Sequence, residues 1–255
     1  MFGLRNKSGS CWINATLQGI FRIPQLQTRF REGEEDTKNP VEMCVAEVWA
    51  SKGDEGLNAL YQCVKTVTMP AGEGIGDSHE LLEFLCDKIP FLDKLMRFKI
   101  GHHIRCKNCS YSDVREDSLI EFSIAGEGRT DMSVSEAILR AVTPVDIPDW
   151  GCEKCHKKGC RKQLLIASLP DVLVFHQTSL KTSVSYTAIL TVNGVKYMLI
   201  AVICFNGGHW WTYGRDPPPG NPWYELNDGH VRSFDAKSFP LVRMMRMLIY
   251  YRLNE

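Results

Sequence analysis

The sequence predicts an α+β fold in which a helical N-terminal part precedes a part built mainly of strands. In several segments before residue 97, apolar residues recur at the spacing of amphipathic helices. From Phe98 onward β-branched and aromatic runs dominate, and two C-x-x-C pairs begin at Cys106 and Cys152. With 255 residues, of which 44% are hydrophobic, the chain can bury a large core without disulfide bonds.

The composition and charge exclude several classes of protein. Thirty basic and thirty acidic residues cancel, so no overall field attracts nucleic acid or an anionic membrane. No stretch reaches the roughly 18 apolar residues of a membrane span, and Met1–Phe21 carries charges where a signal peptide is apolar. We therefore expect an intracellular monomer of the cytoplasm and/or nucleus, with no nucleic-acid or membrane partner. Its ten cysteines then indicate metal binding or catalysis.

The N-terminal part is expected to contain four helices. The first starts near Ser10 and is ended by Pro24, because the apolar residues between them step by four, three and one. The other helices are expected over the segments Val41–Ala50, Leu57–Val67 and Asp77–Ile89. The intervening segments Arg31–Asn39 and Ala71–Gly76 are expected to form loops, because they are rich in charge or glycine.

The second part is expected to be mainly strand. The expected strands are Leu164–Ala167, Val172–Phe175, Ala188–Val192, Tyr197–Phe205 and Met247–Tyr251. Asn193 and Gly194 separate two of these runs, and both residues tolerate the positive φ of a type I′ turn. The dipeptide therefore predicts a β-hairpin.

Cys11 is a candidate nucleophile because of its place at the start of the first helix. Ser10 is positioned to cap this helix, which puts Cys11 in the first turn. Free backbone N–H groups and the positive end of the helix dipole would stabilise a thiolate there. A small buried apolar residue at a helix start has the same pattern, so Cys11 alone does not decide between the two.

The residues around Cys11 carry a family resemblance. Residues 3–18 read G-L-R-N-K-S-G-S-C-W-I-N-A-T-L-Q. This segment resembles the cysteine box of the ubiquitin-specific proteases, G-L-x-N-x-G-N-[ST]-C-[YF]-x-N-[SA]-x-[LI]-Q, with departures at Ser8, Gly9 and Trp12. The resemblance implies that Cys11 is the nucleophile and that Asn6 donates to the oxyanion, a role that needs a side-chain N–H.

Residues near the C-terminus resemble the histidine box of the same family. Residues 197–213 read Y-M-L-I-A-V-I-C-F-N-G-G-H-W-W-T-Y, and residues 223–228 read W-Y-E-L-N-D. The resemblance implies that His209 is the base and that Asn227 orients it, with Asp228 as the competing candidate. Substrate contacts are expected from Gly207, Gly208 and Trp210. The same register makes His176 a core histidine.

Four cysteines form a candidate structural zinc site. Cys106-x-x-Cys109 and Cys152-x-x-Cys155 provide the four thiols that a tetrahedral zinc requires. Their positions match the fingers of the ubiquitin-specific proteases. Spare donors nearby are His102, His103, His156 and Cys160. A basic run at residues 154–162 is more typical of a solvated face than of a nucleic-acid site.

An acidic pair bears on the substrate. Asp77 and Glu80 have capping-box spacing, and residues 76–82 also resemble the family box Q-D-A-x-E-[FL], with Gly76 in place of its Gln. In the family these acids hold the arginines of the C-terminal tail of ubiquitin. The resemblance implies a deubiquitinating thiol isopeptidase with a structural zinc ion, whose partners are ubiquitin or a ubiquitin-like modifier and its conjugates.

The resemblance covers nearly the whole chain and implies its architecture. We expect a compact papain-like fold of ubiquitin-specific protease type, formed by residues 1–255 as a single catalytic domain. Residues 1–97 would form the thumb, residues 98–165 the zinc-bearing fingers and residues 166–255 the palm. The short loops are also similar to the SUMO-directed branch of these isopeptidases. SUMO specificity and an inert ubiquitin-binding pseudoenzyme therefore remain as alternatives.

Overall fold

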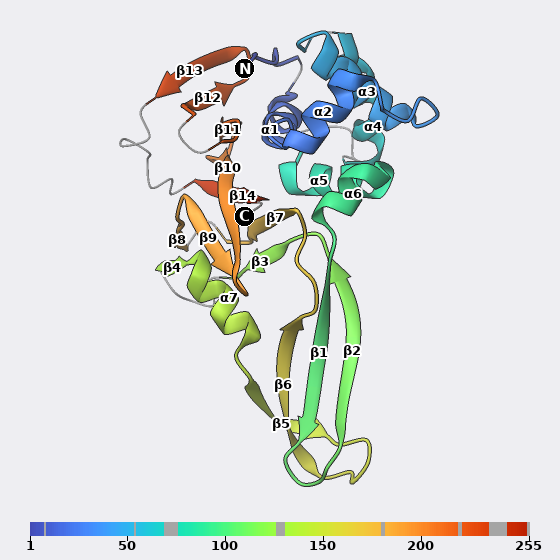
Figure 1. Ribbon diagram of the computed structural model, residues 1–255, viewed down its shortest axis with the longest axis vertical. Helices are drawn as coiled ribbons and strands as arrows, with labels where there is room; N and C mark the ends of the chain where they lie inside the picture. Colours follow the sequence, from blue (N-terminus) through green and yellow to red (C-terminus); the bar gives the residue numbers. More distant parts are fainter. Residues whose placement is uncertain are drawn as a thin grey trace.

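The computed structural model describes residues 1–7, 9–53, 55–68, 76–125, 131–179, 182–218, 221–234 and 244–253. Most of the helices gather at one end of the molecule beside a large sheet, and a long four-stranded extension leads away from both (Figure 1). This arrangement confirms the predicted α+β class. Among the helices in these ranges, none is long and apolar enough to cross a membrane.

The helical lobe is assembled around a fully buried first helix. The described helices are α1 (Cys11–Ile20), α2 (Pro24–Glu32), α3 (Pro40–Ala50), α4 (Glu55–Thr68), α5 (Ser78–Lys88), α6 (Pro90–Met96) and α7 (Val134–Val142). Every residue of α1 is buried, because the helix packs against α5 and the large sheet at once. A Cβ at Gly19 would lie 3.0 Å from the side chains of Ile203 and Ile249, so glycine permits this close packing.

Three helices were not predicted from the sequence. Pro24 was expected to end the first helix, but α1 already ends at Ile20 and Pro24 is the first residue of α2. A proline at this position loses no intrahelical hydrogen bond and has a helical φ. The loop expected from Arg31 therefore begins only at Gly33, whose φ of 68° ends α2. Helices α6 and α7 are short, and the apolar periodicity of the sequence did not predict them either.

The central strands of the large sheet are mostly buried on both faces, and the sheet forms the second lobe. Its strands lie in the order β13-β12-β11-β10-β14-β7-β3, and β9 pairs with the first four residues of β10. Their bounds are β3 (Phe122–Ile124), β7 (Val172–Gln177), β9 (Ile189–Val192), β10 (Val195–Phe205), β11 (Trp210–Gly214), β12 (Trp223–Asn227), β13 (His230–Phe234) and β14 (Met245–Arg252). In β7, Val172 and Val174 join the core under the helices, whereas Leu173 and Phe175 join a second core on the other face.

The predicted hairpin is confirmed. Strands β9 and β10 pair antiparallel, with Val192 opposite Val195. The two residues between them, Asn193 and Gly194, have φ values of 47° and 80°, as a type I′ turn requires.

The extension is a four-stranded sheet in the order β2-β1-β6-β5. Its strands are β1 (Phe98–Cys106), β2 (Ser112–Leu119), β5 (Val145–Gly151) and β6 (Lys158–Ile166), and a small parallel pair is formed by β4 (Asp131–Ser133) and β8 (Ser183–Ser185). The side chains of β2 and β5 are mostly exposed. Because neither strand buries an apolar face, neither has the alternating pattern from which strands are predicted.

Two predicted features lie outside the described residues. These are Ser8 of the cysteine box and all of the glycine-rich run before the fifth helix except Gly76.

Candidate active site

Cys11 is the first residue of α1 and is only 2% exposed. Ser10 occupies the capping position, and its carbonyl accepts from the N–H of Asn14 at 3.0 Å. Its hydroxyl does not cap the helix as predicted. Instead, the hydroxyl accepts from the N–H of Lys7 at 3.0 Å and so fixes the turn that precedes the helix.

The electrostatic surroundings of Cys11 differ from the sequence-based expectation. Burial raises the pKa of the Cys11 thiol, and the negative charge of Asp228 raises it further. The backbone N–H groups of Trp210, Trp12 and Cys11 itself lower the pKa but do not outweigh burial. The lowering of the Cys11 pKa that was expected from the helix start is therefore smaller than the raising by burial in this structure. The contact with the Trp210 N–H also places the thiol beside the residue that follows His209.

His209 is held in a tight turn between β10 and β11. The Oδ1 atom of Asn206 accepts from the N–H of Gly208 at 3.0 Å and from the N–H of His209 at 2.8 Å. Gly207 has a φ of 98°, which few other residues could adopt. Asn206 was not predicted as a site residue, although an Asn followed by Gly-Gly is a signal for such a side-chain-stabilised turn.

Asn227 lies closer to the imidazole of His209 than Asp228 does. Its Oδ1 atom is 2.8 Å from His209 Nε2, whereas the nearest Asp228 oxygen, Oδ2, is 3.7 Å away. Both residues are at the end of β12, where Asp228 begins the turn into β13 with a φ of 50°. An amide that accepts from Nε2 fixes the tautomer in which Nδ1 is free to take a proton.

Asp228 connects the cysteine box to the β12–β13 turn. Its carboxylate accepts from Asn6 Nδ2 at 3.0 Å and from Asn14 Nδ2 at 2.7 Å, and its carbonyl accepts from the N–H of Leu4 at 2.9 Å. Asn6 also anchors the segment before α1, because its Oδ1 accepts from the N–H groups of Gly9 and Ser10. Asn14 was not predicted as a site residue, although it is one of the residues that match the family box.

The three residues predicted to contact substrate differ in their exposure to solvent. Gly207 and Gly208 are exposed beside His209. The indole of Trp210, by contrast, is 2% exposed and stacks on Phe205 with ring centroids 4.4 Å apart. Its side chain therefore belongs to the core in this structure and is not at a surface that a substrate reaches. The backbone of Trp210 remains next to Cys11.

The acidic pair lies at the start of α5. The Oδ1 atom of Asp77 accepts from the N–H of His79 at 2.7 Å, so Asp77 caps the helix as its position predicted. Glu80 is exposed in the first turn. Immediately before Asp77, a Cβ at Gly76 would lie 2.6 Å from the indole of Trp12. The Trp12 indole therefore fills the space that a side chain at position 76 would need. The two departures from the family pattern, Trp12 and Gly76, are thus neighbours in space.

The four predicted metal ligands come together at the tip of the extension. Their sulfur atoms all lie within 4.8 Å of one another, and two sulfur pairs, Cys106–Cys155 and Cys109–Cys152, are each 3.7 Å apart. A tetrahedral zinc with Zn–S bonds of about 2.3 Å requires S–S distances of about 3.8 Å. The N–H of Asn108 donates to Cys106 and lowers the pKa of this thiol to about 6. The donor set therefore fits a tetrahedral metal ion.

Comparison with known proteins places the chain in a family. A family model described as ubiquitin carboxyl-terminal hydrolase matches residues 2–250. The chain belongs to the ubiquitin carboxyl-terminal hydrolase family. Within this family, ubiquitin carboxyl-terminal hydrolase 47 of Homo sapiens is 24% identical over 198 residues, which cover 67% of this chain and 14% of that protein. Ubiquitin carboxyl-terminal hydrolase 25 of Arabidopsis thaliana is 22% identical over 319 aligned positions, with 99% of this chain and 47% of that protein covered. The chain therefore spans less than half the length of either relative.

Solved structures of the family have the same fold. The SAGA DUB module of Ubp8, Sgf11, Sus1 and Sgf73 bound to monoubiquitin gives a TM-score of 0.84 at 17% identity, over 100% of this chain and 69% of that chain. The module bound to ubiquitin aldehyde gives 0.79 at 18% identity, over 100% of this chain and 70% of that chain. The likeness confirms the predicted papain-like fold of ubiquitin-specific protease type.

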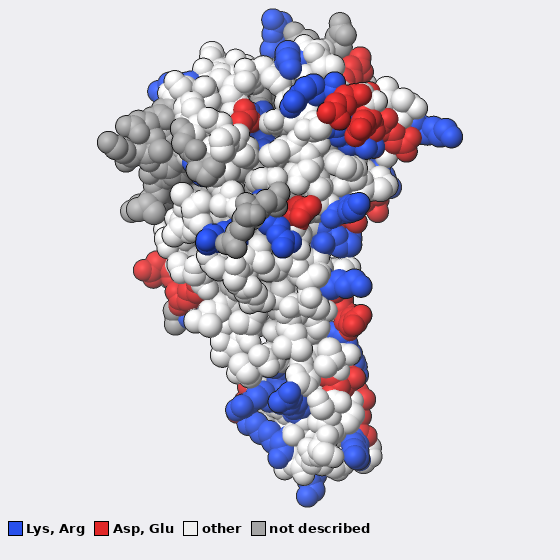
Figure 2. Space-filling model, in the orientation of Figure 1, with Lys and Arg blue, Asp and Glu red and all other residues white. Residues whose placement is uncertain are grey.

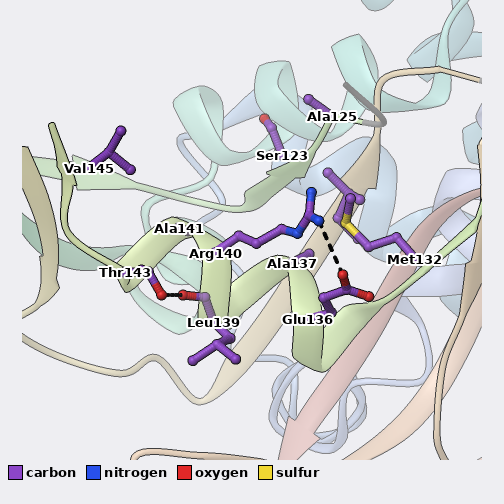
Figure 3. A pocket seen from close by; sticks show the side chains of 11 residues that line it. Ser123, Ala125, Met132, Glu136, Ala137, Leu139, Arg140, Ala141, Thr143 and Val145 are labelled. Carbon is purple, nitrogen blue, oxygen red and sulfur yellow. Dashed lines mark hydrogen bonds and ion pairs between the residues drawn. The ribbon is translucent and has the colours of Figure 1, made fainter. Parts of the chain in front are cut away.

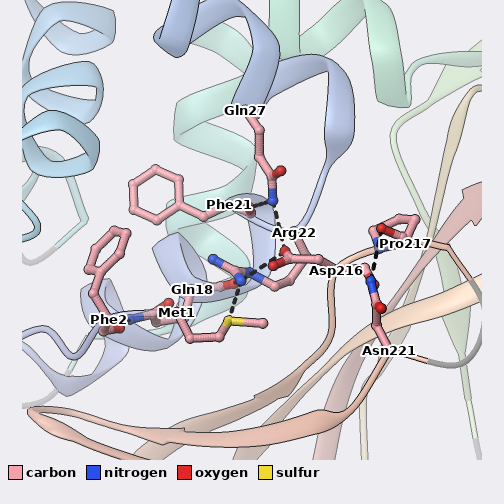
Figure 4. A network of polar contacts seen from close by, with 9 residues as sticks. All are labelled: Met1, Phe2, Gln18, Phe21, Arg22, Gln27, Asp216, Pro217 and Asn221. Carbon is pink, nitrogen blue, oxygen red and sulfur yellow. Dashed lines mark hydrogen bonds and ion pairs between the residues drawn. The ribbon is translucent and has the colours of Figure 1, made fainter.

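A buried arginine connects the end of α1 to the end of β11. Arg22 follows α1, and its guanidinium is bonded to Asp216, which follows β11, at 2.9 Å (Figure 4). Met1 and Gln27 complete the network, through Met1 Sδ on the same guanidinium and Gln27 Nε2 on Asp216. Cys11 starts α1, and His209 immediately precedes β11. The ion pair therefore joins the two elements at their other ends, away from the candidate catalytic residues.

Two members of the basic run at residues 154–162, Lys158 and Arg161, pair with acids. Figure 2 shows Lys and Arg side chains gathered at the far end of the extension, with Asp and Glu beside them. Asp146 lies 3.0 Å from Arg161 and 2.5 Å from Lys107, and Asp149 lies 3.7 Å from Lys158. This mixture of charges is typical of a solvated face.

One of the larger hollows among the described residues lies away from the candidate catalytic residues. It has a volume of about 530 Å³ and is formed between α7, the end of β3 and the start of β5 (Figure 3). Leu139 and Val145 line it and are 63% and 57% exposed, while Arg140 pairs with Glu136, one turn earlier on the same face of α7, at 3.2 Å. The candidate catalytic residues are instead at the junction of the two lobes.

Proposed function

We propose that the chain is a cysteine-dependent deubiquitinase that hydrolyses the bond after the C-terminal glycine of ubiquitin in conjugates or chains. The observation that carries the proposal is the 2.8 Å contact between His209 Nε2 and Asn227 Oδ1, because it leaves Nδ1 to take the proton of Cys11. The contact of the Cys11 thiol with the N–H of Trp210 supports the approach of these groups. Family membership and the ubiquitin-bound neighbour structures support the substrate.

The proposed reaction is acyl transfer through a thioester. His209 takes the Cys11 proton as the sulfur attacks the glycine carbonyl carbon and the carbonyl electron pair moves to oxygen. When the carbonyl re-forms, the C–N bond breaks and His209 gives its proton to the leaving lysine amine. Water then attacks the thioester with His209 as base, which releases the modifier's carboxylate and restores the Cys11 thiol.

Asn6 is proposed to stabilise the oxyanion. Its amide nitrogen carries two hydrogens, and the bond to Asp228 uses one of them. Asn6 is exposed, so a substrate carbonyl can approach the second hydrogen. A donor that is already fixed before the charge develops stabilises the transition state without further reorganisation.

The acids at the start of α5 favour ubiquitin as the modifier. Glu80 is exposed, and Asp77 is partly exposed while it caps the helix. We propose that these carboxylates pair with the arginines of the C-terminal tail of ubiquitin. SUMO tails have no such arginines, and carboxylates that are desolvated without a partner would reject them.

The metal at the tip of the extension is proposed to be structural zinc. Four thiolates would fill its tetrahedral coordination, so no position remains for water or substrate. Zinc there would join the β1–β2 turn to the end of β5.

The test uses C-terminal electrophile probes of ubiquitin, SUMO and NEDD8 with the wild-type chain and with Cys11→Ala. A covalent adduct between the ubiquitin probe and the wild type, and none with Cys11→Ala, is the expected result. Cys86→Ala is a matched control, because Cys86 is equally buried on α5 and has no proposed role. It should leave adduct formation unchanged.

The same panel distinguishes the alternatives. An adduct with the SUMO probe alone would replace the ubiquitin proposal with a SUMO isopeptidase. Binding of ubiquitin without an adduct from any probe would indicate an inert ubiquitin-binding pseudoenzyme.

A further inference from the structure

A second cluster of metal-binding side chains lies where the helical lobe meets the sheet. It consists of His79 in the first turn of α5, Glu121 just before β3, and His176 in β7. Glu121 and His176 are each 9% exposed, and the side chain of His79 is 17% exposed. The cluster is thus built from three separate elements and is almost closed to solvent.

The cluster has more bonding capacity than the described residues use. Glu121 Oε1 lies 2.8 Å from His79 Nε2 and 3.4 Å from His176 Nδ1. The second carboxylate oxygen, Glu121 Oε2, and the second ring nitrogen, His176 Nε2, are buried without a hydrogen-bond partner among the described residues. A buried carboxylate needs a positive partner, and neutral imidazoles do not provide one. A cation, either a proton on a histidine or a metal ion, must supply that charge.

The donor atoms lie near the spacing of a small tetrahedral site. Zn²⁺ bound to imidazole and carboxylate at about 2.0–2.2 Å requires ligand atoms about 3.3–3.6 Å apart. The observed distances of 2.8 and 3.4 Å to Glu121, and of 3.8 Å from His79 Nε2 to Glu83 Oε1, bracket that range. Glu83 is on α5 one turn after His79 and half exposed, and it lies outside the group of donor atoms within 4.8 Å of one another, so it would close the site from the solvent side by moving inward.

We propose that His79, Glu121 and His176, with Glu83 as a fourth donor, form a second zinc site, separate from the four cysteines. The two imidazoles are stacked in this structure, with centroids 3.7 Å apart and planes 17° from parallel. Binding therefore requires the rings to open toward the metal, with His79 moving most because it is the more exposed. The ion would connect α5 to β7 and to the residue before β3, and so would fix the helix that Asp77 caps and whose first turn carries Glu80.

The test uses the full chain with zinc retained in the four-cysteine site, to which Co²⁺ alone is added. Cobalt held by imidazole and carboxylate gives visible d–d absorption without the near-ultraviolet band of a thiolate-to-cobalt bond. One equivalent of such cobalt is expected in the wild type. His79→Asn and Glu121→Gln should each weaken its binding by at least about tenfold, because each removes a direct ligand. His103→Asn is a matched control, since His103 is an equally buried histidine that bonds Ser112 in the extension.

Each outcome of the cobalt experiment either supports or overturns the second zinc site. Cobalt binding that is lost in both ligand variants and retained in His103→Asn supports the second site. No bound cobalt beyond the thiolate site, or equal binding by wild type and His79→Asn, would overturn it and leave the cluster as a proton-sharing group. If Glu121→Gln does not fold, the test rests on His79→Asn, whose fold is checked by circular dichroism.

Discussion

Asn227 Oδ1 lies 2.8 Å from Nε2 of His209, almost 1 Å closer than the nearest oxygen of Asp228. The neighbouring Asp228 carboxylate is occupied by Asn6 and Asn14. Two adjacent residues at one turn therefore serve different partners: Asn227 contacts the imidazole of His209, and Asp228 contacts the cysteine box.

Asn227→Ala is expected to lower turnover more than Asp228→Ala. Loss of the amide lets the His209 ring rotate, and misplacement by about 1 Å costs on the order of 100-fold in rate. Hydrolysis of a fluorogenic C-terminal ubiquitin amide gives kcat for both variants. The opposite ranking would transfer the orienting role to Asp228.

The pH dependence of Cys11 alkylation tests its surroundings. Because burial raises the pKa of this thiol, its half-maximal rate with iodoacetamide should occur above the value of about 8.5 for an ordinary cysteine. Asp228→Asn should move the profile toward lower pH, because the charge of Asp228 favours the neutral thiol. Mass spectrometry of the Cys11 peptide separates this rate from those of the other nine cysteines. A midpoint near neutrality in the free chain would contradict the burial argument.

Trp12 and Gly76 are expected to be energetically coupled. Gly76→Ala puts a methyl group 2.6 Å from the indole, and such overpacking costs about 1–3 kcal/mol of unfolding free energy. In a Trp12→Tyr background the same substitution should cost less, because the smaller ring vacates part of the space. Urea unfolding of the four proteins measures the coupling. Additive effects would show that the two departures from the family pattern are independent.

The Arg22–Asp216 pair should respond differently to loss of either partner. Arg22 is 1% exposed, so Asp216→Ala leaves a buried cation and should destabilise the fold by about 3 kcal/mol. Arg22→Met should cost about 1 kcal/mol, because the side chain of Asp216 is 39% exposed and water can solvate it. Chemical denaturation at neutral pH compares them. Equal losses would mean that Arg22 acts through packing alone.

Cys109→Ser is expected to reduce the zinc content of the four-cysteine site to near zero and to lower the thermal midpoint. Three thiolates and a hydroxyl bind zinc more weakly, and the tip of the extension has only a small apolar cluster of its own. Elemental analysis and thermal unfolding measure the two effects. Cys204→Ser, in a fully buried strand position, is unsuitable as a control, so Cys44→Ser on the partly exposed face of α3 is used instead. Unchanged zinc content in Cys109→Ser would contradict the ligand assignment.

The pattern of neighbouring residues was sufficient to predict those helices, strands and turns that are specified locally. The buried helix α1, the strands β7, β10 and β14, and the Asn193-Gly194 hairpin were all predicted, because burial imposes a regular apolar period and a type I′ turn demands particular residues. The strands β2 and β5 were missed because they are exposed on both faces. Pro24 was misread because a proline can end one helix or begin the next, and only the path of the chain distinguishes the two.

The sequence by itself determined the family, the identities of the candidate nucleophile, base and thiol ligands, and the α+β class, because motifs and periodicities are local properties. Only the tertiary structure decided which of Asn227 and Asp228 faces His209, that Ser10 binds Lys7 rather than capping α1, and that burial raises the pKa of Cys11. It alone joined His79 to Glu121 and His176. Distances, desolvation and charge pairing arise between segments far apart in the chain, and no pattern of neighbouring residues records them.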